Sequence, residues 1–180
     1  AGYRIQKETF WHSRGTAKYL DFGSAKACIV DFERFAKHLE DTPYDVIHFN
    51  FGLNDIFRGR NGAWHNPVDQ YAKDLAKIVT LLKTHGAKVI WANITPIPAN
   101  APHNPEDDEL IYNAAAAKVM KKHGIPINDL HSVVTAWDGY AEWKKGNDVH
   151  FPGAVYSKLA EKIAGVILAK FQGSEDSTEK

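Results

Sequence analysis

Residues 45–55 (DVIHFNFGLND) constrain the fold of this chain more than any other segment. Residues 45–51 form a run of strand length that is rich in apolar side chains, and a Gly-x-Asn-Asp turn follows at once. We therefore expect a buried strand that ends at this turn. Open α/β sheets place their functional groups outside the carboxyl ends of the strands, so the turn is a candidate site.

The residue types of this turn suit acyl-transfer chemistry. Gly52 allows the backbone to turn sharply or to approach a ligand closely. The neutral side-chain amide of Asn54 can donate a hydrogen bond to a developing oxyanion. Asp55 is expected to cap or brace the turn.

Strand-like and helix-like segments alternate along the chain, which predicts a parallel sheet with helices on both faces. We expect a weak strand at 3–8 and further strands at 87–93 and 125–128. Apolar spacing and end signals predict helices over 25–39, 67–84, 107–122, 129–136 and 152–171. We predict a single domain over residues 1–171 and a disordered polar tail over 172–180.

Composition argues against several classes of partner. The 180 residues suffice for one full core, and 22 basic side chains balance 22 acidic ones. No field therefore favours nucleic acid or an anionic membrane. No apolar run reaches the length of a membrane span. Cys28 is the single cysteine, which leaves the compartment open; we favour export, periplasmic or extracellular, over the cytoplasm.

Cofactor motifs are not visible in the sequence. No Gly-rich phosphate loop follows a strand, and the nine histidines form no HxH or HExxH pattern. We therefore expect neither a nucleotide cofactor nor a metal. His48 is expected to be a hydrogen-bonded core histidine. His12, His65 and His103 lie in polar loops, where solvated side chains are favoured over residues that line a site mouth.

A second candidate site element is residues 147–150 (NDVH), just before the predicted closing helix. His150 falls in a loop, and the carboxylate of Asp148 could orient its imidazole. The alternative is a surface histidine in a turn that leads into a helix. The pairing with Gly-x-Asn-Asp in the same α/β pattern favours the catalytic interpretation.

With these two blocks, the chain resembles the SGNH (GDSL-like) hydrolases over roughly residues 44–171. Residues 52–55 are similar to the family's Gly-x-Asn-Asp block, and residues 147–150 to its Asp-x-x-His block. The resemblance implies a three-layer αβα sandwich with a flavodoxin-like parallel sheet. It also implies hydrolysis of acyl esters, often on carbohydrates or lipids, with Asn54 donating to the oxyanion and His150 as general base.

The His block departs from the family pattern at one position. The family's Asp, three residues before the histidine, is Asn147 here, and Asp148 sits two residues before it. We expect Asp148 in an altered geometry, or a backbone carbonyl, to hold the ring. An amide at Asn147 cannot stabilise an imidazolium as a carboxylate does.

The family's nucleophile block, an apolar strand that runs into Gly-Asp-Ser, is missing from this sequence. Ser24, in DFGSA, has no apolar strand before it and is disfavoured as the nucleophile. Ser13 and Gly15 fall where the family usually has its second block. Gly15 is therefore a candidate backbone donor to the oxyanion, with an ordinary loop glycine as an equal alternative.

The missing block implies a missing strand. In the order 2-1-3-4-5 the first strand lies between the second and the third. If residues 3–8 are the second strand, the gap costs on the order of several kcal/mol in unpaired backbone groups. Either the residues given are a fragment, or a second chain donates the strand, or residues 3–8 move into the vacant place. We favour the first explanation.

The sequence therefore predicts a serine ester hydrolase that acts on a small-molecule or glycan ester, with the nucleophile supplied from residues outside this chain. One alternative is a non-catalytic fold that binds glycans through loop tryptophans. Another is a module that accepts a strand from a partner. The tryptophans concerned are Trp11, Trp64, Trp137 and Trp143, and packing of long loops explains them equally well.

Overall fold

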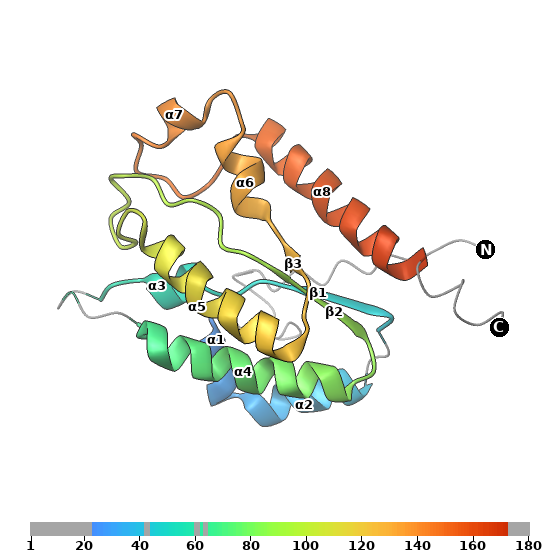
Figure 1. Cartoon of the computed structure of the whole chain (residues 1–180). Coiled ribbons are helices and arrows are strands. Elements are labelled where there is room, and N and C mark those ends of the chain that lie inside the picture. The colour runs from blue at the N-terminus through green and yellow to red at the C-terminus, as the bar shows by residue number, and fades with distance from the viewer. Residues whose placement is uncertain (1–22, 42–43, 60–61, 63–64, 173–180) are drawn as a thin grey trace.

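The computed structural model describes residues 23–41, 44–59, 62 and 65–172, which form an α/β fold of three layers (Figure 1). The middle layer is a small parallel sheet in the order β1-β2-β3. Its strands are β1 (Val46–Phe49), β2 (Lys88–Ala92) and β3 (Ile127–Asn128). The predicted strand at 3–8 and the candidate Gly15 lie outside the described residues.

Helices cover both faces of the sheet, as the alternating pattern predicts (Figure 1). One layer holds α1 (Ala25–Val30), α2 (Phe32–Asp41), α4 (Val68–Thr84) and α5 (Asp108–His123). The other holds α6 (Leu130–Thr135) and α8 (Gly153–Gln172). Two short helices, α3 (Leu53–Ile56) and α7 (Tyr140–Trp143), lie in the connections. None of the described helices is both long and apolar enough to cross a bilayer.

Two apolar clusters hold the layers together. The larger one packs α1, α2, α4 and α5 against one face of the sheet, and Trp91, Tyr71 and Tyr112 are among its fully buried members. The smaller one joins the sheet to α6 and α8 through Ala92, Leu130, Val134, Val155 and Leu159. Burial of these side chains is the main source of stability for a fold of this size.

The predicted strand at 45–51 is correct in place but shorter and less buried than expected. Beyond Phe49, the side-chain amide of Asn50 donates to the carbonyls of Ala92 at 2.7 Å and Asn93 at 3.2 Å, where a longer strand would use its backbone. Residues 46–48 are only partly buried. Among the described residues β1 pairs with β2 alone, and this small sheet fits a sheet without its first strand.

The helix predicted over 25–39 is two helices. The break falls at Asp31, whose backbone (φ −112°, ψ 41°) leaves the helical region and whose carbonyl accepts the Phe35 N–H that starts α2. The β-branched Ile29 and Val30, followed by Asp, make this a weak point for a continuous helix.

Candidate active site

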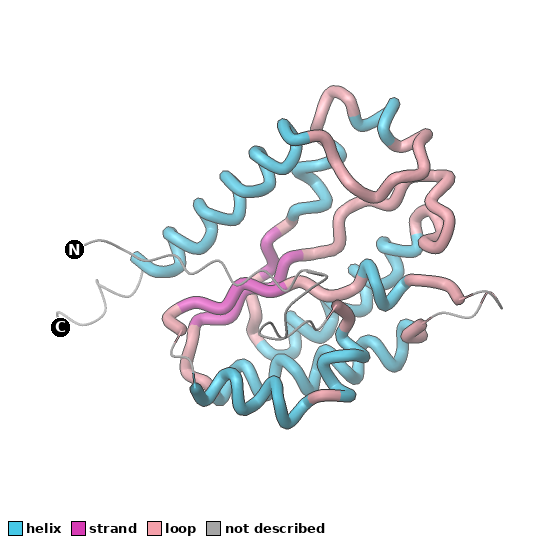
Figure 2. Tube along the Cα trace, turned by 180° about the vertical axis from the view of Figure 1, so that it is seen from behind, coloured by secondary structure: helices cyan, strands magenta, loops and turns pink. Residues whose placement is uncertain are grey.

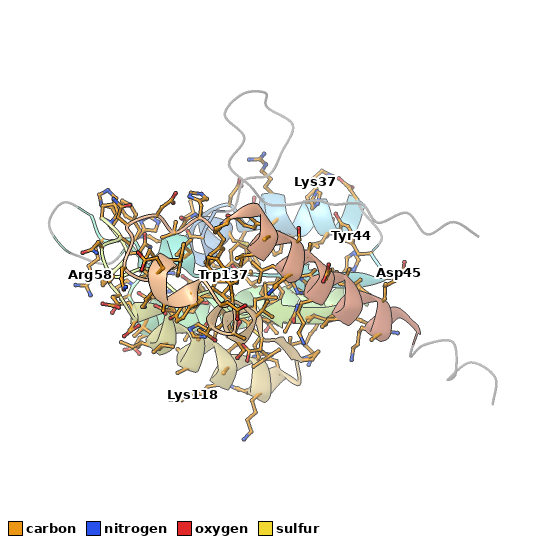
Figure 3. The ribbon with its side chains drawn as sticks, turned by 90° about the horizontal axis from the view of Figure 1, so that it is seen from above. Lys37, Tyr44, Asp45, Arg58, Lys118 and Trp137 are labelled. Atoms are coloured by element: carbon orange, nitrogen blue, oxygen red, sulfur yellow. The ribbon has the colours of Figure 1, made fainter. Side chains whose placement is uncertain are left out.

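The candidate site lies at the carboxyl end of the sheet. Seen from above, Asp45, which precedes β1, and Arg58, which follows α3, lie at opposite ends of the molecule (Figure 3). β1 therefore runs from the first end toward the second. Most of the long loops gather at this second end (Figure 2), where α3 and α7 also lie (Figure 1).

Gly52 makes the turn between β1 and α3 possible. Its backbone has φ +145°, a value that residues with a side chain rarely adopt. A Cβ added at this position would overlap the side chain of Ile94. The Tyr71 hydroxyl also holds the turn, because it donates to the Phe51 carbonyl at 2.7 Å. The glycine thus serves a sharp turn packed on the core, which was one of the two roles expected of it.

Asn54 is an exposed residue of α3, and its amide touches the chain that leads into α1. Its Nδ2 donates to the Gly23 carbonyl at 2.7 Å. Sequence reasoning missed Gly23, although Gly-Ser before a helical pattern is a recognisable turn and cap signal. The backbone next to the predicted oxyanion donor is therefore that of Gly23 and Ser24.

Asp55 is fully buried and braces the neighbouring helix. Its two carboxylate oxygens accept from the backbone N–H groups of Ala25 at 2.9 Å and Lys26 at 3.2 Å. Burial raises the pKa of the Asp55 carboxyl, and these hydrogen bonds, with one from Asn66, act in the opposite direction. The Asp55 carboxylate thus braces the start of α1 and contacts Asn66, whereas the sequence predicted that it would cap or brace the turn.

Asp148 holds His150. The ring Nδ1 lies 2.7 Å from the Asp148 carboxylate, which also accepts the His150 backbone N–H at 3.0 Å. The backbone bond, and then the ring, lower the pKa of Asp148. Both side chains are exposed. This is the altered geometry expected from the sequence, with the carboxylate of Asp148 in place of one at Asn147, which is also exposed.

A single loop, residues 93–107, connects the Asn54 and His150 regions. The Asn104 side chain donates to the Leu53 carbonyl of α3 at 2.7 Å. Seven residues earlier along the loop, Ile97 O accepts from Lys144 Nζ at 2.7 Å, and Asn100 N–H donates to the Gly146 carbonyl at 3.0 Å. The two blocks are thus tied to one segment.

Aromatic rings flank His150. The Trp143 and Phe151 rings are tilted against each other with centroids 4.7 Å apart, Trp143 stacks on Tyr140 at 6.1 Å, and Phe151 is 5.9 Å from Tyr156. The Trp143 indole also donates to the His150 carbonyl at 2.9 Å. Trp137 packs on the smaller core cluster, whereas Trp11 and Trp64 lie outside the described residues.

Each serine that the structure describes has its hydroxyl in a local helix contact. Ser24 Oγ accepts the Ala27 N–H at 3.0 Å as the N-cap of α1. Ser132 Oγ donates to the Asp129 carboxylate at 2.5 Å, and Ser157 Oγ to the Gly153 carbonyl at 3.2 Å. None of these three contacts involves His150.

Other histidines that the sequence singled out make contacts away from His150. His48 is hydrogen-bonded to Asn128 at 3.0 Å, as predicted, but it is only partly buried and is therefore not a core residue. The His103 ring packs at a tilt against Phe57 with centroids 4.6 Å apart, and the His65 carbonyl accepts from Lys26 Nζ. Within the described ranges, no three His, Cys, Asp or Glu side chains gather closely enough to hold a metal ion. His12 lies outside these ranges.

An open parallel sheet with polar side chains outside the carboxyl ends of its strands is the arrangement in which open α/β proteins bind ligands, and it defines the structural class of this chain. The sequence matches the GDSL-like Lipase/Acylhydrolase family over residues 11–158, so the chain belongs to this family. A search of curated proteins finds no match.

Solved structures share the fold at low sequence identity. An acetyl xylan esterase, AlAXEase, superposes with a TM-score of 0.66 at 17% identity, covering 83% of this chain and 79% of that one. A lipase/acylhydrolase from Enterococcus faecalis gives 0.61 at 21% identity, covering 80% and 70%. Axe2, an acetylxylan esterase from Geobacillus stearothermophilus, gives 0.60 at 16% identity, covering 82% and 67%.

Proposed function

We propose that this protein is a serine ester hydrolase in which Asn54 and the Asp148–His150 pair act at one site. The observation that carries the proposal is the pair itself, placed at the same edge of the sheet as the Asn54 amide and tied to it through the 93–107 loop. His150 is the general base, and Asn54 and backbone N–H groups stabilise the oxyanion.

In this proposal each polar atom of the site has a distinct part. With Nδ1 of His150 held by Asp148, Nε2 is the nitrogen that takes the serine proton and returns it to the leaving alkoxide. One N–H of the Asn54 amide is engaged by the Gly23 carbonyl, and the second remains for the oxyanion. Gly15 stays a predicted backbone donor, and Gly23, beside Asn54, is another.

The nucleophilic serine is proposed to come from residues outside this chain. The local contacts of Ser24, Ser132 and Ser157 support this assignment. The same segment would pair with the edge of β1, whose one partner among the described residues is β2. Attack on the ester forms an acyl-enzyme, which water then hydrolyses.

The proposed substrates are acyl esters of carbohydrates. The aromatic rings beside His150 provide flat apolar surfaces that suit the apolar faces of sugars. Two of the structural neighbours are acetyl xylan esterases by name, which agrees with this proposal.

A fluorophosphonate probe tests the proposal. The chain is expressed with the residues that its gene encodes before Ala1, labelled, weighed intact and mapped by peptide sequencing. We expect one adduct, on a serine that precedes Ala1. An adduct on Ser24 or another serine of this chain would keep the hydrolase but refute the placement of the nucleophile. No adduct, together with no hydrolysis of aryl acetates, would refute the hydrolase.

A second candidate function is glycan binding without catalysis, which the ring cluster of Tyr140, Trp143, Phe151 and Tyr156 favours; Tyr156 is exposed and the other three rings are partly exposed. Calorimetry with xylo-oligosaccharides separates the two functions. Tight binding by a protein that neither reacts with the probe nor hydrolyses esters would favour binding alone. Binding that weakens in Trp143→Ala while labelling persists would instead make the cluster a substrate platform of the esterase.

A further inference from the structure

A buried network of polar side chains lies directly behind Asn54. Its members are Asp55 on α3, Asn66 just before α4, and Asp74 within α4, with exposed fractions of 0%, 0% and 2%. Burial of two carboxylates is costly unless donors satisfy them. The catalytic scheme above uses none of these side chains, so the network needs another explanation.

The Asp55 carboxylate fixes the start of α1. It accepts the backbone N–H groups of Ala25 and Lys26, and the Ser24 hydroxyl accepts the next one, from Ala27, at 3.0 Å. The first three N–H groups of this helix are thus held by side chains, two of them by a residue of α3. The backbone just before Ala25 is thereby held in place relative to α3.

Asn66 in turn fixes Asp55. Its Nδ2 donates to Asp55 at 2.8 Å and to Asp74 at 3.0 Å, so one amide group bridges two carboxylates. The Asn66 backbone N–H donates to the Asp55 carbonyl at 3.1 Å, and its carbonyl accepts the Tyr112 hydroxyl at 2.6 Å. Gln70 completes the network by donating to Asp74 at 2.7 Å. Asn66 is therefore anchored to α3, α4 and α5 at once.

We propose that Asn66 is a positioning residue of the oxyanion site. It orients the Asp55 carboxylate, which holds the Gly23–Ala25 backbone against the Asn54 amide. The contact from Asn54 Nδ2 to the Gly23 carbonyl is the point where this network reaches the site. Because Asn54 and Asp55 are consecutive, one turn of α3 supplies both the donor to the oxyanion and the clamp on the facing backbone.

Removing the Asn66 amide has two local consequences. Asp55 loses the side-chain donor that Asn66 provides, and the two carboxylates lose the group that bridges them. A buried carboxylate without its donor must turn or draw in water. Either change frees the start of α1. The catalytic consequence of this inference rests on the proposed function; the structural part does not.

Amide hydrogen exchange tests the structural part directly. Asn66→Ala is compared with Asn128→Ala, in which an asparagine of equal burial (1% exposed) is removed from its contact with His48. In Asn66→Ala we expect Ala25 and Lys26 to exchange at least about tenfold faster than in the native protein, the scale of one lost buried hydrogen bond. The interior amides of α8 should keep their rates, and the control should leave Ala25 and Lys26 unchanged.

Ester hydrolysis by the full encoded polypeptide tests the catalytic part. We expect kcat of Asn66→Ala to fall by about 10²-fold, the effect of a displacement near 1 Å, with KM nearly unchanged. Unchanged exchange at Ala25 and Lys26 in a folded Asn66→Ala protein would overturn the inference, as would equal effects in the Asn128 control. If Asn66→Ala does not fold, Asn66→Ser, which keeps a shorter donor, is measured in the same way.

The hydrogen-exchange and hydrolysis measurements together distinguish a failure of the proposed function from a failure of the Asn66 inference. A native protein that hydrolyses no ester refutes the proposed function, while the exchange rates still decide whether Asn66 holds this backbone. Faster exchange with an unchanged kcat would overturn the positioning role and leave the hydrolase intact.

Discussion

At the scale of single residues, His150 and Asp148 form the most exposed part of the proposed machinery. The ring is held by one carboxylate two positions earlier, and both side chains are more than half exposed, at 61% and 70%. An exposed pair of this kind contributes little to the free energy of folding, so we expect it to matter for catalysis.

His150→Ala is expected to lower kcat by about 10²–10⁴-fold, the usual contribution of a general base. The free energy of unfolding should stay within about 0.5 kcal/mol of the native value, as for other substitutions of exposed residues. Asp148→Asn should also lower kcat, since an amide does not stabilise the imidazolium. Steady-state hydrolysis of an aryl acetate measures both. Full activity in Asp148→Asn would reduce Asp148 to a turn residue.

Gly52→Ala is expected to destabilise the fold by about 1–3 kcal/mol, because the backbone is at positive φ and the new methyl group meets Ile94. Denaturant unfolding measures the loss. Gly86→Ala is an instructive comparison, since it also has positive φ but open space around its Cβ position. If Gly52→Ala cost no more than Gly86→Ala, the close packing at Ile94 would be wrong.

At the scale of elements, the strand β1 carries a partly buried histidine on its face. Burial lowers the pKa of His48 below its ordinary value of 6.5. The unfolded chain therefore takes up this proton at a higher pH than the folded protein does. The contribution of neutral His48 to the free energy of unfolding is fully present above pH 6.5. It is lost as the pH falls through and below that value.

The Tm of the native protein should accordingly fall further than the Tm of His48→Gln when the pH is lowered from about 7.5 to about 5, the range in which histidine titrates. Glutamine keeps a polar partner for Asn128 without the titration. Replacing the exposed His103 by glutamine is the matched control and should follow the native curve. Parallel curves for native and His48→Gln would show that this histidine does not couple to folding.

Local signals predict most of the helices and strands of this chain. Pro67 precedes α4, Gly86 follows it, and Asp129 caps α6 through the Ser132 N–H, and residues of these types mark helix ends in a sequence. The break at Asp31 and the short helices α3 and α7 were not predicted. The short helix α3 is held by a contact from a distant segment, the one from Asn104 to Leu53, which no local pattern records.

The candidate site was likewise only partly predictable from the sequence. Asn54, Asp55, Asp148 and His150 were found because their residue types follow strands or precede a helix. Gly23 and Asn66 were missed, since their importance comes from contacts with residues 31 and 11 positions away. Buried polar networks of this kind give no periodic signal in a sequence.

At the scale of the whole molecule, the site depends on how the segment before α8 is held against the rest of the fold. Lys144 is the main anchor: its side chain is 17% exposed, and its ammonium bonds the Ile97 carbonyl at 2.7 Å and Asp107 at 2.9 Å, with Glu106 at 3.4 Å. These contacts fasten the segment that carries His150 to the 93–107 loop.

Lys144→Met should destabilise the protein by about 1–3 kcal/mol through lost charged hydrogen bonds. It should also speed amide exchange over residues 144–150. Lys145→Met is the matched control, because the Lys145 side chain is 73% exposed and its ammonium pairs with the neighbouring Glu142. Equal exchange profiles in the two variants would contradict the anchoring role.

The most direct measurement of the central claim is a crystal structure of the full encoded polypeptide after reaction with a fluorophosphonate. The phosphonyl oxygen should accept a hydrogen bond from Asn54 Nδ2, and His150 Nε2 should face the modified serine oxygen. An adduct that neither side chain reaches would contradict the account.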